Sequence, residues 1–419
     1  MMSDSRINRW LVLTSSVIIN LCIGSAYAWS VFQKPLIDVF HWSTSDTSLV
    51  FTISFGIVPL AMIVAGKIQD KVGPKTVILV GGFLFGGGIL GAGFTHSLAV
   101  LYTTYGITAG IGMGTVYACT VANTVKLFPD RRGLASGLVA AGFGSGAVLF
   151  APLSTWLINS YGVLTAFTIL GTGHLILIPV LSWFVKAAPP GYAPAGWLPP
   201  ANPSRSAAAV DKDWTQMLRD PSFYLLWCVY TLGTISGLMI IAHASPYGQE
   251  IVKIAPQTAA MVVSALALAN TGGRIFWGWV SDKVGRFSTV VVMFVLGGIA
   301  MLVLPAVSGL VPFVMVLIVV GLCFGGFMGI FPSITADAFG PKNLGMNYGV
   351  MFTAFGLAAF VGPRLAATVK ELYDGDYTHA FLIAAALSLV GIVLTLVLVF
   401  RGIACRHQYT PPGDSSSRP

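Results

Sequence analysis

The chain has 419 residues, of which 55% are hydrophobic and 9% are charged, and its formal net charge is +8. A soluble globular domain carries about 25% charged residues, so the composition excludes that class and indicates a polytopic membrane protein. The five cysteines are scattered and form no CxxC or Cys/His cluster. The sequence therefore supports no metal site or disulfide framework, and we expect no cofactor.

Twelve apolar segments follow one another along the chain, each near or above the roughly 20 residues that a spanning helix needs. They run approximately over residues 10–32, 47–65, 76–94, 99–124, 133–158, 164–185, 222–243, 256–280, 288–308, 311–336, 344–367 and 379–401. Ala26-Tyr27-Ala28 also resembles a signal-peptidase site, but we expect the first segment to be retained as the partner of the seventh in a repeat. The expected fold class is an all-α integral membrane protein with twelve transmembrane helices.

Lys and Arg residues are distributed unevenly among the connecting loops. If the N-terminus is cytoplasmic, the outer loops hold only Lys34, Lys253 and Lys370 of the 23 Lys and Arg residues, with Arg364 near an outer helix end. The positive-inside rule then places both termini in the cytoplasm. The net positive charge is thus explained by membrane topology and does not indicate nucleic-acid binding. We expect a plasma membrane location, the bacterial inner membrane in particular, with the lipid bilayer as surrounding partner.

A sequence repeat with an offset of 212 positions relates the two halves of the chain. The matching residues are Gly66 and Gly278, Asp70 and Asp282, Lys71 and Lys283, Gly73 and Gly285, and the segments 133–137 and 345–349. Because each half holds an even number of helices, the two six-helix repeats are parallel. Parallel halves are typical of rocking transporters, which bind substrate between the halves near the membrane midplane.

The repeat suggests four parts. We expect an N-terminal six-helix half (1–186), a cytoplasmic linker loop (187–221), a C-terminal six-helix half (222–402) and a disordered cytoplasmic tail (403–419). The early linker is rich in Pro, Gly and Ala, whereas its later stretch 211–219 is compatible with a short surface helix.

The repeated turn places an acidic residue at a helix end in each half. Asp70 or Asp282 can bind the N-terminus of a neighbouring helix and basic side chains on the inner face, which would latch one conformation. The residues expected in this gating role are Asp70, Lys71, Asp282, Lys283, Arg131 and Arg132. The alternative is a charged turn that only limits helix ends, but two copies at matched positions argue against it.

Arg274 is the only charge placed deep inside an apolar segment. It precedes Asp282 by eight residues, which is roughly 12 Å along a helix, and an intramembrane charge is by default a functional hypothesis. Its planar guanidinium matches one carboxylate, and a dianion would bring a second, unpaired charge. A monocarboxylate is therefore favoured. The alternative is a structural arginine paired with a helix carbonyl or with Asp282, although its repeat counterpart is the uncharged Met62.

Four other side chains are candidates for substrate binding. Asn270 lies one turn before Arg274 and can orient the guanidinium or the ligand. Tyr117 can donate a hydrogen bond to the carboxylate, although a tyrosine in a membrane helix is as often a packing residue. Tyr27 and Trp29 can line the cavity or simply fill gaps between Gly-rich helices.

Two residues near outer helix ends are candidates for accessory roles. His243 can gate or relay a proton, or it is simply solvated. Arg364 can attract anions at the entrance, or it extends its head group to the membrane surface. No Asp or Glu is expected in mid-membrane, so coupling would come from a counter-anion or from a proton carried with the weak acid.

The repeated Gly-x-x-x-Asp-Lys-x-Gly turn resembles the signature loop of the major facilitator superfamily. Other motifs resemble the oxalate–formate antiporter family and, more distantly, the monocarboxylate transporters. They are Tyr27-Ala28-Trp29, the segment 128–137, Asp211-Lys212-Asp213-Trp214, Ser245-Pro246-Tyr247-Gly248, Arg274 followed by Phe276-Trp277-Gly278, Phe331-Pro332-Ser333 and Asn347-Tyr348-Gly349. The resemblance covers nearly the whole chain.

The resemblance implies roles for matching positions. Arg274, in the eighth apolar segment (256–280), matches the arginine that the family uses for a substrate carboxylate. Tyr27, Trp29 and Tyr117 match cavity aromatics. A lysine that the oxalate carrier places in the eleventh segment (344–367) falls on Phe355 here. This departure puts a dicarboxylate substrate in doubt.

Other departures concern both branches. The aromatics that enclose oxalate in the tenth apolar segment (311–336) fall on Phe324 and Met328. The monocarboxylate branch typically has an acid in the eighth segment, and that position is Asn270 here. Its lysine in the first segment falls on Val31, with Lys34 one turn further out.

We therefore expect a monomeric secondary active transporter of small monocarboxylates such as pyruvate, lactate or formate, working by alternating access. The alternatives are an oxalate–formate or other dicarboxylate exchanger and, more remotely, a non-transporting membrane sensor. An enzyme is not expected, because the sequence shows no Ser/His/Asp set, metal cluster or phosphate loop.

Overall fold

The computed structural model describes residues 7–189, 191–194 and 211–401, and these residues form helices and no strands. Eleven of the described helical stretches are long and apolar enough to cross a membrane. The remaining expected segment is helical from Leu98 to Leu127, but a π-helical stretch, η2 (Tyr102–Ala109), divides it into α6 (Leu98–Leu101) and α7 (Gly110–Leu127). The expected all-helical membrane fold is confirmed. The tail predicted at 403–419 lies outside the described residues, as do 190 and 195–210 of the predicted linker.

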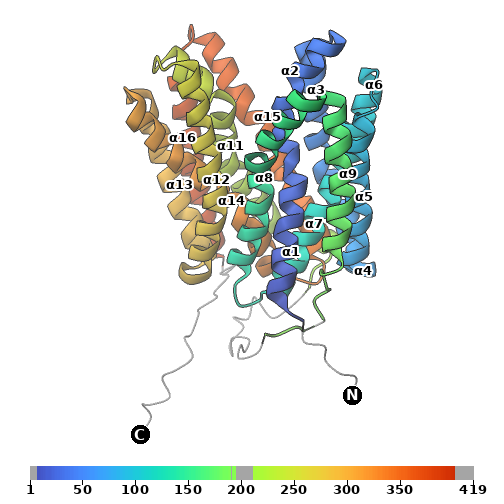
Figure 1. Cartoon of the computed structure of the whole chain (residues 1–419). Helices are drawn as coiled ribbons and strands as arrows, with labels where there is room; N and C mark the ends of the chain where they lie inside the picture. The colour runs from blue at the N-terminus through green and yellow to red at the C-terminus, as the bar shows by residue number, and fades with distance from the viewer. Residues whose placement is uncertain (1–6, 190, 195–210, 402–419) are drawn as a thin grey trace, which may run out of the picture.

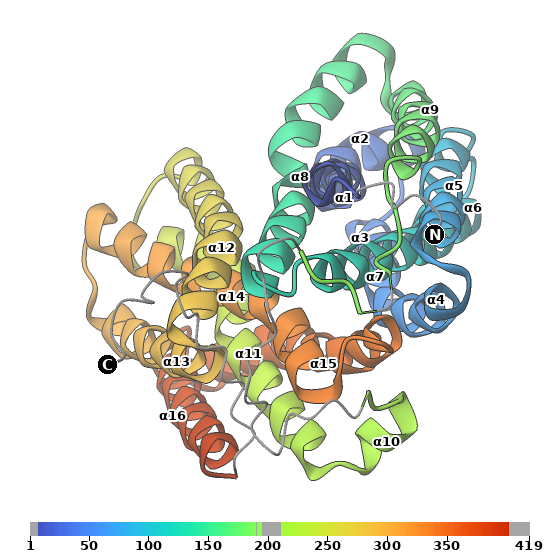
Figure 2. The same cartoon turned by 90° about the horizontal axis from the view of Figure 1, so that it is seen from below.

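The helices gather into two bundles, as Figure 1 shows. The short helix α10 (Trp214–Arg219) lies between the two bundles in the chain and is labelled in Figure 2. The other helices of the first bundle are α1 (Arg9–Ile23), the 3-10 helix η1 (Gly24–Ala28), α2 (Trp29–Phe40), α3 (Thr44–Gly56), α4 (Val58–Val72), α5 (Pro74–Ala92), α8 (Arg132–Tyr161) and α9 (Val163–Ser182). The second bundle contains α11 (Pro221–Glu250), α12 (Pro256–Val284), α13 (Arg286–Val303), the 3-10 helix η3 (Leu304–Ala306), α14 (Leu310–Phe339), α15 (Leu344–Leu372) and α16 (Thr378–Phe400).

The bundles meet through α4, α7 and α8 on one side and α12, α14 and α15 on the other (Figure 2). α1 begins and α16 ends at the same end of the molecule, and the ribbons of the two bundles diverge toward the opposite end (Figure 1). We call the end where α1 begins the closed end.

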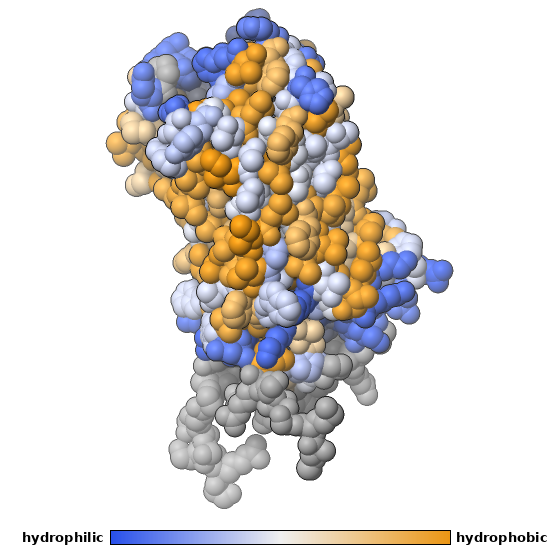
Figure 3. Space-filling view, turned by 45° about the vertical axis from the view of Figure 1, so that its right-hand side comes forward, coloured by the Kyte–Doolittle hydropathy of each residue, from blue (hydrophilic) through white to orange (hydrophobic). Residues whose placement is uncertain are grey.

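A broad apolar belt covers the face of the molecule that Figure 3 shows, and polar residues collect at its two ends. The belt includes large exposed side chains such as Val64, Val311 and Leu389. At its edge the Lys75 Nζ atom lies 3.5 Å from the centroid of the Trp183 ring. Aromatic rings and extended basic side chains are typical of the membrane–water boundary. The belt shows that the chain is a multi-pass membrane protein.

Glycines bring the two bundles into backbone contact at the closed end. Gly66 of α4 faces Gly345 of α15, and Gly133 of α8 faces Gly278 of α12, so that a Cβ atom at Gly66 or Gly133 would collide with the opposing backbone. In lipid, helices associate through close packing rather than through hydrophobic burial, and small residues allow that approach. The repeated glycines therefore determine how closely the bundles approach each other.

The segment 211–220 fastens the start of α11 to the loop before α15. The Lys212 N–H donates to the Phe339 carbonyl at 2.9 Å, and the Lys212 carbonyl accepts a hydrogen bond from Asn347 Nδ2, also at 2.9 Å. Lys212 also pairs with Asp220. Burial raises the pKa of Asp220, but hydrogen bonds from Lys212 and Ser222 outweigh it, and the net pKa is lowered. This part of the expected linker therefore binds to the second bundle.

Replacing Gly66 by valine should separate the bundles at the closed end. The added side chain has no space against the Gly345 backbone, and overpacking of this kind typically costs about 1–3 kcal/mol. We expect a lower unfolding temperature for Gly66→Val in detergent. Gly87→Val is the matched control, because a Cβ at Gly87 meets nothing within 4 Å. Equal unfolding temperatures for the two variants would contradict this account of the contact.

Candidate functional site

Arg274 is the buried cation at the contact between α12 and α8. Only 1% of the residue is exposed. Its Nη1 donates to the Ala140 carbonyl at 2.6 Å and its Nε donates to Asn270 Oδ1 at 3.3 Å. Gly144 leaves room for the guanidinium, since a Cβ there would lie 2.9 Å from Arg274 Cζ. Asn270 thus orients the side chain.

Arg274 forms no ion pair within the part of the chain that the structure describes. The alternative of a structural arginine expected a bond to a helix carbonyl or to Asp282. The bond to the Ala140 carbonyl agrees with the first possibility. The pairing with Asp282 is wrong, because Asp282 pairs with Arg286 at 2.7 Å. Arg286 is equally buried and also binds Asp337 at 3.1 Å. A buried charge is costly unless it is paired. Arg286 meets this requirement with protein carboxylates, whereas Arg274 does not.

Tyrosines from both bundles lie near the Arg274 guanidinium. Tyr27 is within hydrogen-bonding reach of it, and Tyr117 and Tyr230 are within electrostatic range. The Phe143 ring contacts both Tyr27 and Tyr117, with centroids 5.0 Å apart in each pair. The 3-10 helix η1 interrupts the first membrane span at Tyr27. Arg274, Asn270, Tyr117 and Tyr27 are therefore brought together, as the sequence predicts.

Trp29 belongs to a different environment. Its ring packs on Tyr105 at a centroid distance of 4.7 Å, inside the first bundle. The structure gives it no contact with Arg274 among the described residues, so its geometry fits packing and not substrate binding.

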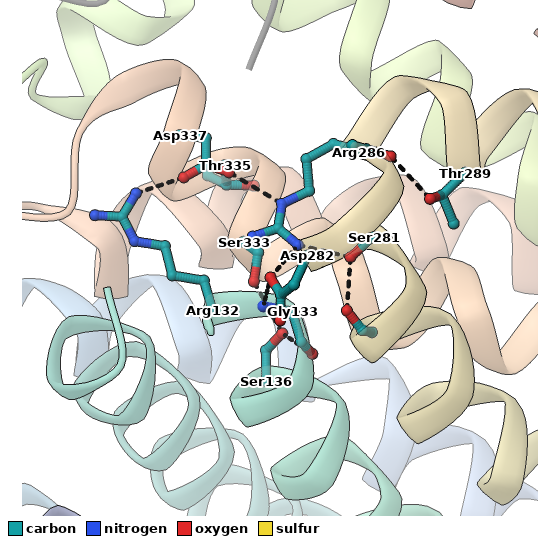
Figure 4. Close-up of polar contacts among 12 residues, drawn as sticks. Arg132, Gly133, Ser136, Ser281, Asp282, Arg286, Thr289, Ser333, Thr335 and Asp337 are labelled. Atoms are coloured by element: carbon teal, nitrogen blue, oxygen red, sulfur yellow. Dashed lines mark hydrogen bonds and ion pairs between the residues drawn. The ribbon is translucent and has the colours of Figure 1, made fainter. Parts of the chain in front are cut away.

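Asp282 connects the bundles at the closed end, as Figure 4 shows. Its carboxylate accepts the Gly133 N–H at 2.9 Å and the Leu134 N–H at 2.8 Å, which are unpaired donors in the first turn of α8. A carboxylate at a helix N-terminus satisfies these donors and complements the helix dipole. Arg132 and Arg286 lie on either side of Asp337 and both bind it.

Asp70 makes the equivalent contact in the other direction. It accepts a hydrogen bond from the Met346 N–H in the first turn of α15 and pairs with Lys126 at 2.9 Å. Lys126 Nζ also donates to the Lys342 carbonyl at 2.9 Å. Each repeated aspartate therefore binds the start of a helix in the opposite bundle.

The remaining predicted residues lie outside these contacts. Lys71 is exposed, Lys283 lies 3.9 Å over the Trp279 ring, and Arg131 is 3.8 Å from its neighbour Asp130. None of these three joins the latch between the bundles.

The two accessory candidates lie on α11 and α15. His243 Nε2 lies 3.0 Å from the Pro363 carbonyl, which links the two helices. Arg364 is exposed, and its Cζ lies 4.0 Å over the Phe360 ring. The geometry of Arg364 fits the alternative of a surface-directed arginine.

Phe355, which stands where the oxalate carrier has a lysine, lies among aromatic rings. Phe355 stacks on Phe352 at a centroid distance of 5.0 Å and lies 6.5 Å from Phe324. Lys34 pairs with Asp38 at the surface. No second buried cation without a carboxylate partner therefore adjoins Arg274 among the described residues.

Sequence reasoning missed five residues of these clusters, which are Tyr230, Tyr348, Lys126, Arg286 and Asp337. Tyr230 and Tyr348 are fully buried near Tyr117, Asp337 binds Arg132 and Arg286, and Lys126 pairs with Asp70. In the sequence, Tyr348 stands out only as part of the motif Asn347-Tyr348-Gly349. Nothing in the sequence indicated which helices face each other.

Comparison with known proteins agrees with this geometry. A family profile described as Major Facilitator Superfamily matches residues 13–363 and, in a second match, 237–414. The chain belongs to the major facilitator superfamily. It is 32% identical over 399 residues to the oxalate:formate antiporter of Oxalobacter formigenes, covering 94% of this chain and 92% of that one. The relatives that match this chain are transporters, and the prediction that it is not an enzyme is confirmed.

More distant relatives support the same conclusion. Monocarboxylate transporter 13 of Rattus norvegicus is 25% identical over 407 residues, covering 94% of this chain and 90% of its own. The crystal structure of the E. coli fucose:proton symporter FucP shares the fold with a TM-score of 0.70 at 13% identity, covering 92% of this chain and 98% of its own. The predicted resemblance to the oxalate–formate antiporter and monocarboxylate transporters is confirmed.

Replacing Asp337 by asparagine should destabilise the closed end. Arg286 would lose one of its two carboxylates while it stays buried, and breaking a buried pair typically costs about 3–5 kcal/mol. We expect a clear drop in unfolding temperature. Glu250→Gln is the control, because its pair with Lys370 is more exposed and such pairs contribute about 0–1 kcal/mol. A similar small effect in both variants would show that the Asp337 contacts do not stabilise this conformation.

Proposed function

We propose that this transporter carries small monocarboxylates by alternating access and that Arg274 binds the substrate carboxylate. The observation that carries the proposal is that the buried Arg274 guanidinium has no carboxylate partner among the described residues. An anionic substrate supplies the missing charge, and a guanidinium binds a carboxylate through paired N–H donors. The resemblance to monocarboxylate transporters supports this class.

A dicarboxylate exchanger is the second candidate, and similarity to the oxalate:formate antiporter favours it. Against it, Phe355 and Phe352 occupy the part of α15 where a second cation would be expected. A dianion on Arg274 would leave one charge unpaired in an apolar environment. We therefore place a single carboxylate at this site, with a proton or a counter-anion as the coupling partner.

The latch residues fit a transport cycle. Asp282 and Asp70 bind α8 and α15 across the bundle contact, and opening the closed end requires these bonds to break. Arg274 and Asp282 lie on the same helix, so a movement of α12 at the substrate site displaces the latch as well.

Arg274→Ala should abolish saturable uptake of labelled pyruvate or lactate into proteoliposomes. Losing one partner of a buried charge pair costs about 2–5 kcal/mol, so we expect uptake to fall by about 30-fold or more. Arg274→Lys keeps the charge but loses the paired donors and should be intermediate. Arg219→Ala, which removes an exposed arginine from α10, should transport normally. Native uptake in the Arg274→Ala variant would exclude Arg274 as the carboxylate site.

We further propose that both termini are cytoplasmic in a plasma membrane, which places the closed end on the cytoplasmic side. A cysteine replacing Lys253, in the turn before α12, should then react with a membrane-impermeant maleimide in intact cells. A cysteine replacing Lys342, in the turn before α15, should react only after the cells are opened. The reverse labelling pattern would invert the topology.

A further inference from the structure

Arg274 connects the two bundles through its side chain as well as through its backbone. The residue lies on α12 of the second bundle, and its Nη1 donates at 2.6 Å to the carbonyl of Ala140 on α8 of the first bundle. One turn nearer the closed end, a Cβ at Gly137 would lie 2.2 Å from the Arg274 carbonyl oxygen. The side-chain bond therefore extends the contact of α8 with α12 from the closed end toward the proposed substrate site.

Gly144 makes this bond possible. A Cβ at Gly144 would lie 2.9 Å from Arg274 Cζ and 3.2 Å from both Nε and Nη1. Gly144 follows Ala140 by four residues, so the two lie on one face of α8. The guanidinium occupies the space that a side chain at Gly144 would fill. Because the colliding atoms are at the flexible end of a long side chain, an added methyl group would move the guanidinium and leave the backbone in place.

The other half of the repeat has the same backbone contact without the cation. At the offset of 212 positions Gly144 corresponds to Gly356, and Arg274 corresponds to Met62. The backbones again approach closely, since a Cβ at Gly349 would lie 2.9 Å from the Met62 carbonyl carbon. A Cβ at Gly356 would meet its nearest neighbour at 3.9 Å, an ordinary contact. Methionine has no side-chain N–H to donate, so the fold itself does not require a side-chain bond at this place.

The Ala140 carbonyl and a substrate carboxylate compete for the same guanidinium. A guanidinium presents paired donors on two edges, one formed by Nη1 and Nη2 and the other by Nε and Nη2. The first edge is next to the Ala140 carbonyl and the second is next to Asn270 Oδ1. Asn270 lies on α12 and moves with Arg274, whereas Ala140 belongs to the opposite bundle. A carboxylate binds a guanidinium more strongly than a neutral carbonyl does, so its arrival on the first edge favours loss of the bond between the bundles.

We propose that the Ala140 carbonyl is an internal ligand of Arg274 in the empty transporter, that the substrate carboxylate displaces it, and that Gly144 is the positioning residue for this exchange. The inference rests on the proposed function, in which Arg274 binds the substrate carboxylate. In the empty protein the bond ties α12 to α8 and helps to keep the closed end shut. Bound substrate removes the tie, so the closed end opens more readily.

The test measures how readily the closed end opens in the purified protein. A cysteine replacing Ser333 is the reporter, because Ser333 is 0% exposed and its Oγ lies 3.0 Å from Ser136 Oγ in the opposite bundle. Alkylation of residue 333 by N-ethylmaleimide, followed by mass spectrometry, then requires the bundles to separate there. In the otherwise native protein the reaction should be slow, and saturating lactate should accelerate it.

Gly144→Ala in the reporter protein should accelerate the reaction about tenfold or more without lactate, the effect expected from one lost hydrogen bond to a charged group. Lactate should then add little. Arg274→Met, which places the residue of the repeat counterpart at this position, removes the same bond from the other side. It should react as fast as Gly144→Ala and should not respond to lactate.

Gly356→Ala is the matched control, because its added Cβ makes only the 3.9 Å contact in the equivalent place of the repeat. It should react as slowly as the otherwise native reporter protein and keep the full response to lactate. A cooperative unfolding transition in each variant shows that the chain is folded. A general loosening of the helices by an added methyl group would accelerate the reaction in Gly356→Ala as well, and this would overturn the assignment of Gly144.

Two further results would overturn the inference. Gly144→Ala and Arg274→Met variants that react at the native rate without lactate would show that the Ala140 bond does not hold the closed end. A native reaction rate that lactate leaves unchanged, in a protein whose lactate uptake depends on Arg274, would show that substrate does not displace the bond. Failure of the proposed function looks different, because then lactate uptake would persist in Arg274→Ala.

Discussion

Removing an ionised side chain from water costs several kcal/mol unless another charge and hydrogen bonds compensate for it, and this constraint separates the two buried arginines of the second bundle. Arg286 is compensated by Asp282 and Asp337, which fixes it as part of the structure. Arg274 has the Asn270 amide, the Ala140 carbonyl and the Tyr27 hydroxyl as neutral partners, and it has no carboxylate partner among the described residues. A mobile anion can complete the environment of Arg274, and a partner that arrives and leaves is what a carrier requires.

The two repeated aspartates make equivalent contacts with helix starts in the opposite bundle, but they differ in their ion-pair partners. Asp282 binds the start of α8 and belongs to a network that contains Arg286, Asp337 and Arg132. Asp70 binds the start of α15 and has Lys126 as its ion-pair partner. The geometry is shared because the glycine contacts bring the same helix ends together in both halves, while the charged partners come from positions that the repeat does not conserve.

The substrate site and the closed end are mechanically connected because single helices contribute to both. α12 carries Arg274 at the centre and Gly278 and Asp282 at the contact with α8. α15 carries Tyr348 within one turn of Gly345, which packs against α4. An α-helix transmits displacement along its axis, so a ligand bound at Arg274 would act on the same helix that carries Asp282 at the closed end.

Sequence alone determined the membrane class, the helical segments, the repeat and the depth of Arg274, because hydrophobic length, glycine spacing and an isolated charge are local properties of the chain. It also supplied Asn270, since residues four apart share a helix face. Only the tertiary structure showed that Asp337 binds two arginines, that Trp29 packs inside one bundle, and that Tyr348 lies beside Tyr117. These relations depend on which helix faces meet, and apolar segments of similar composition do not encode that choice locally.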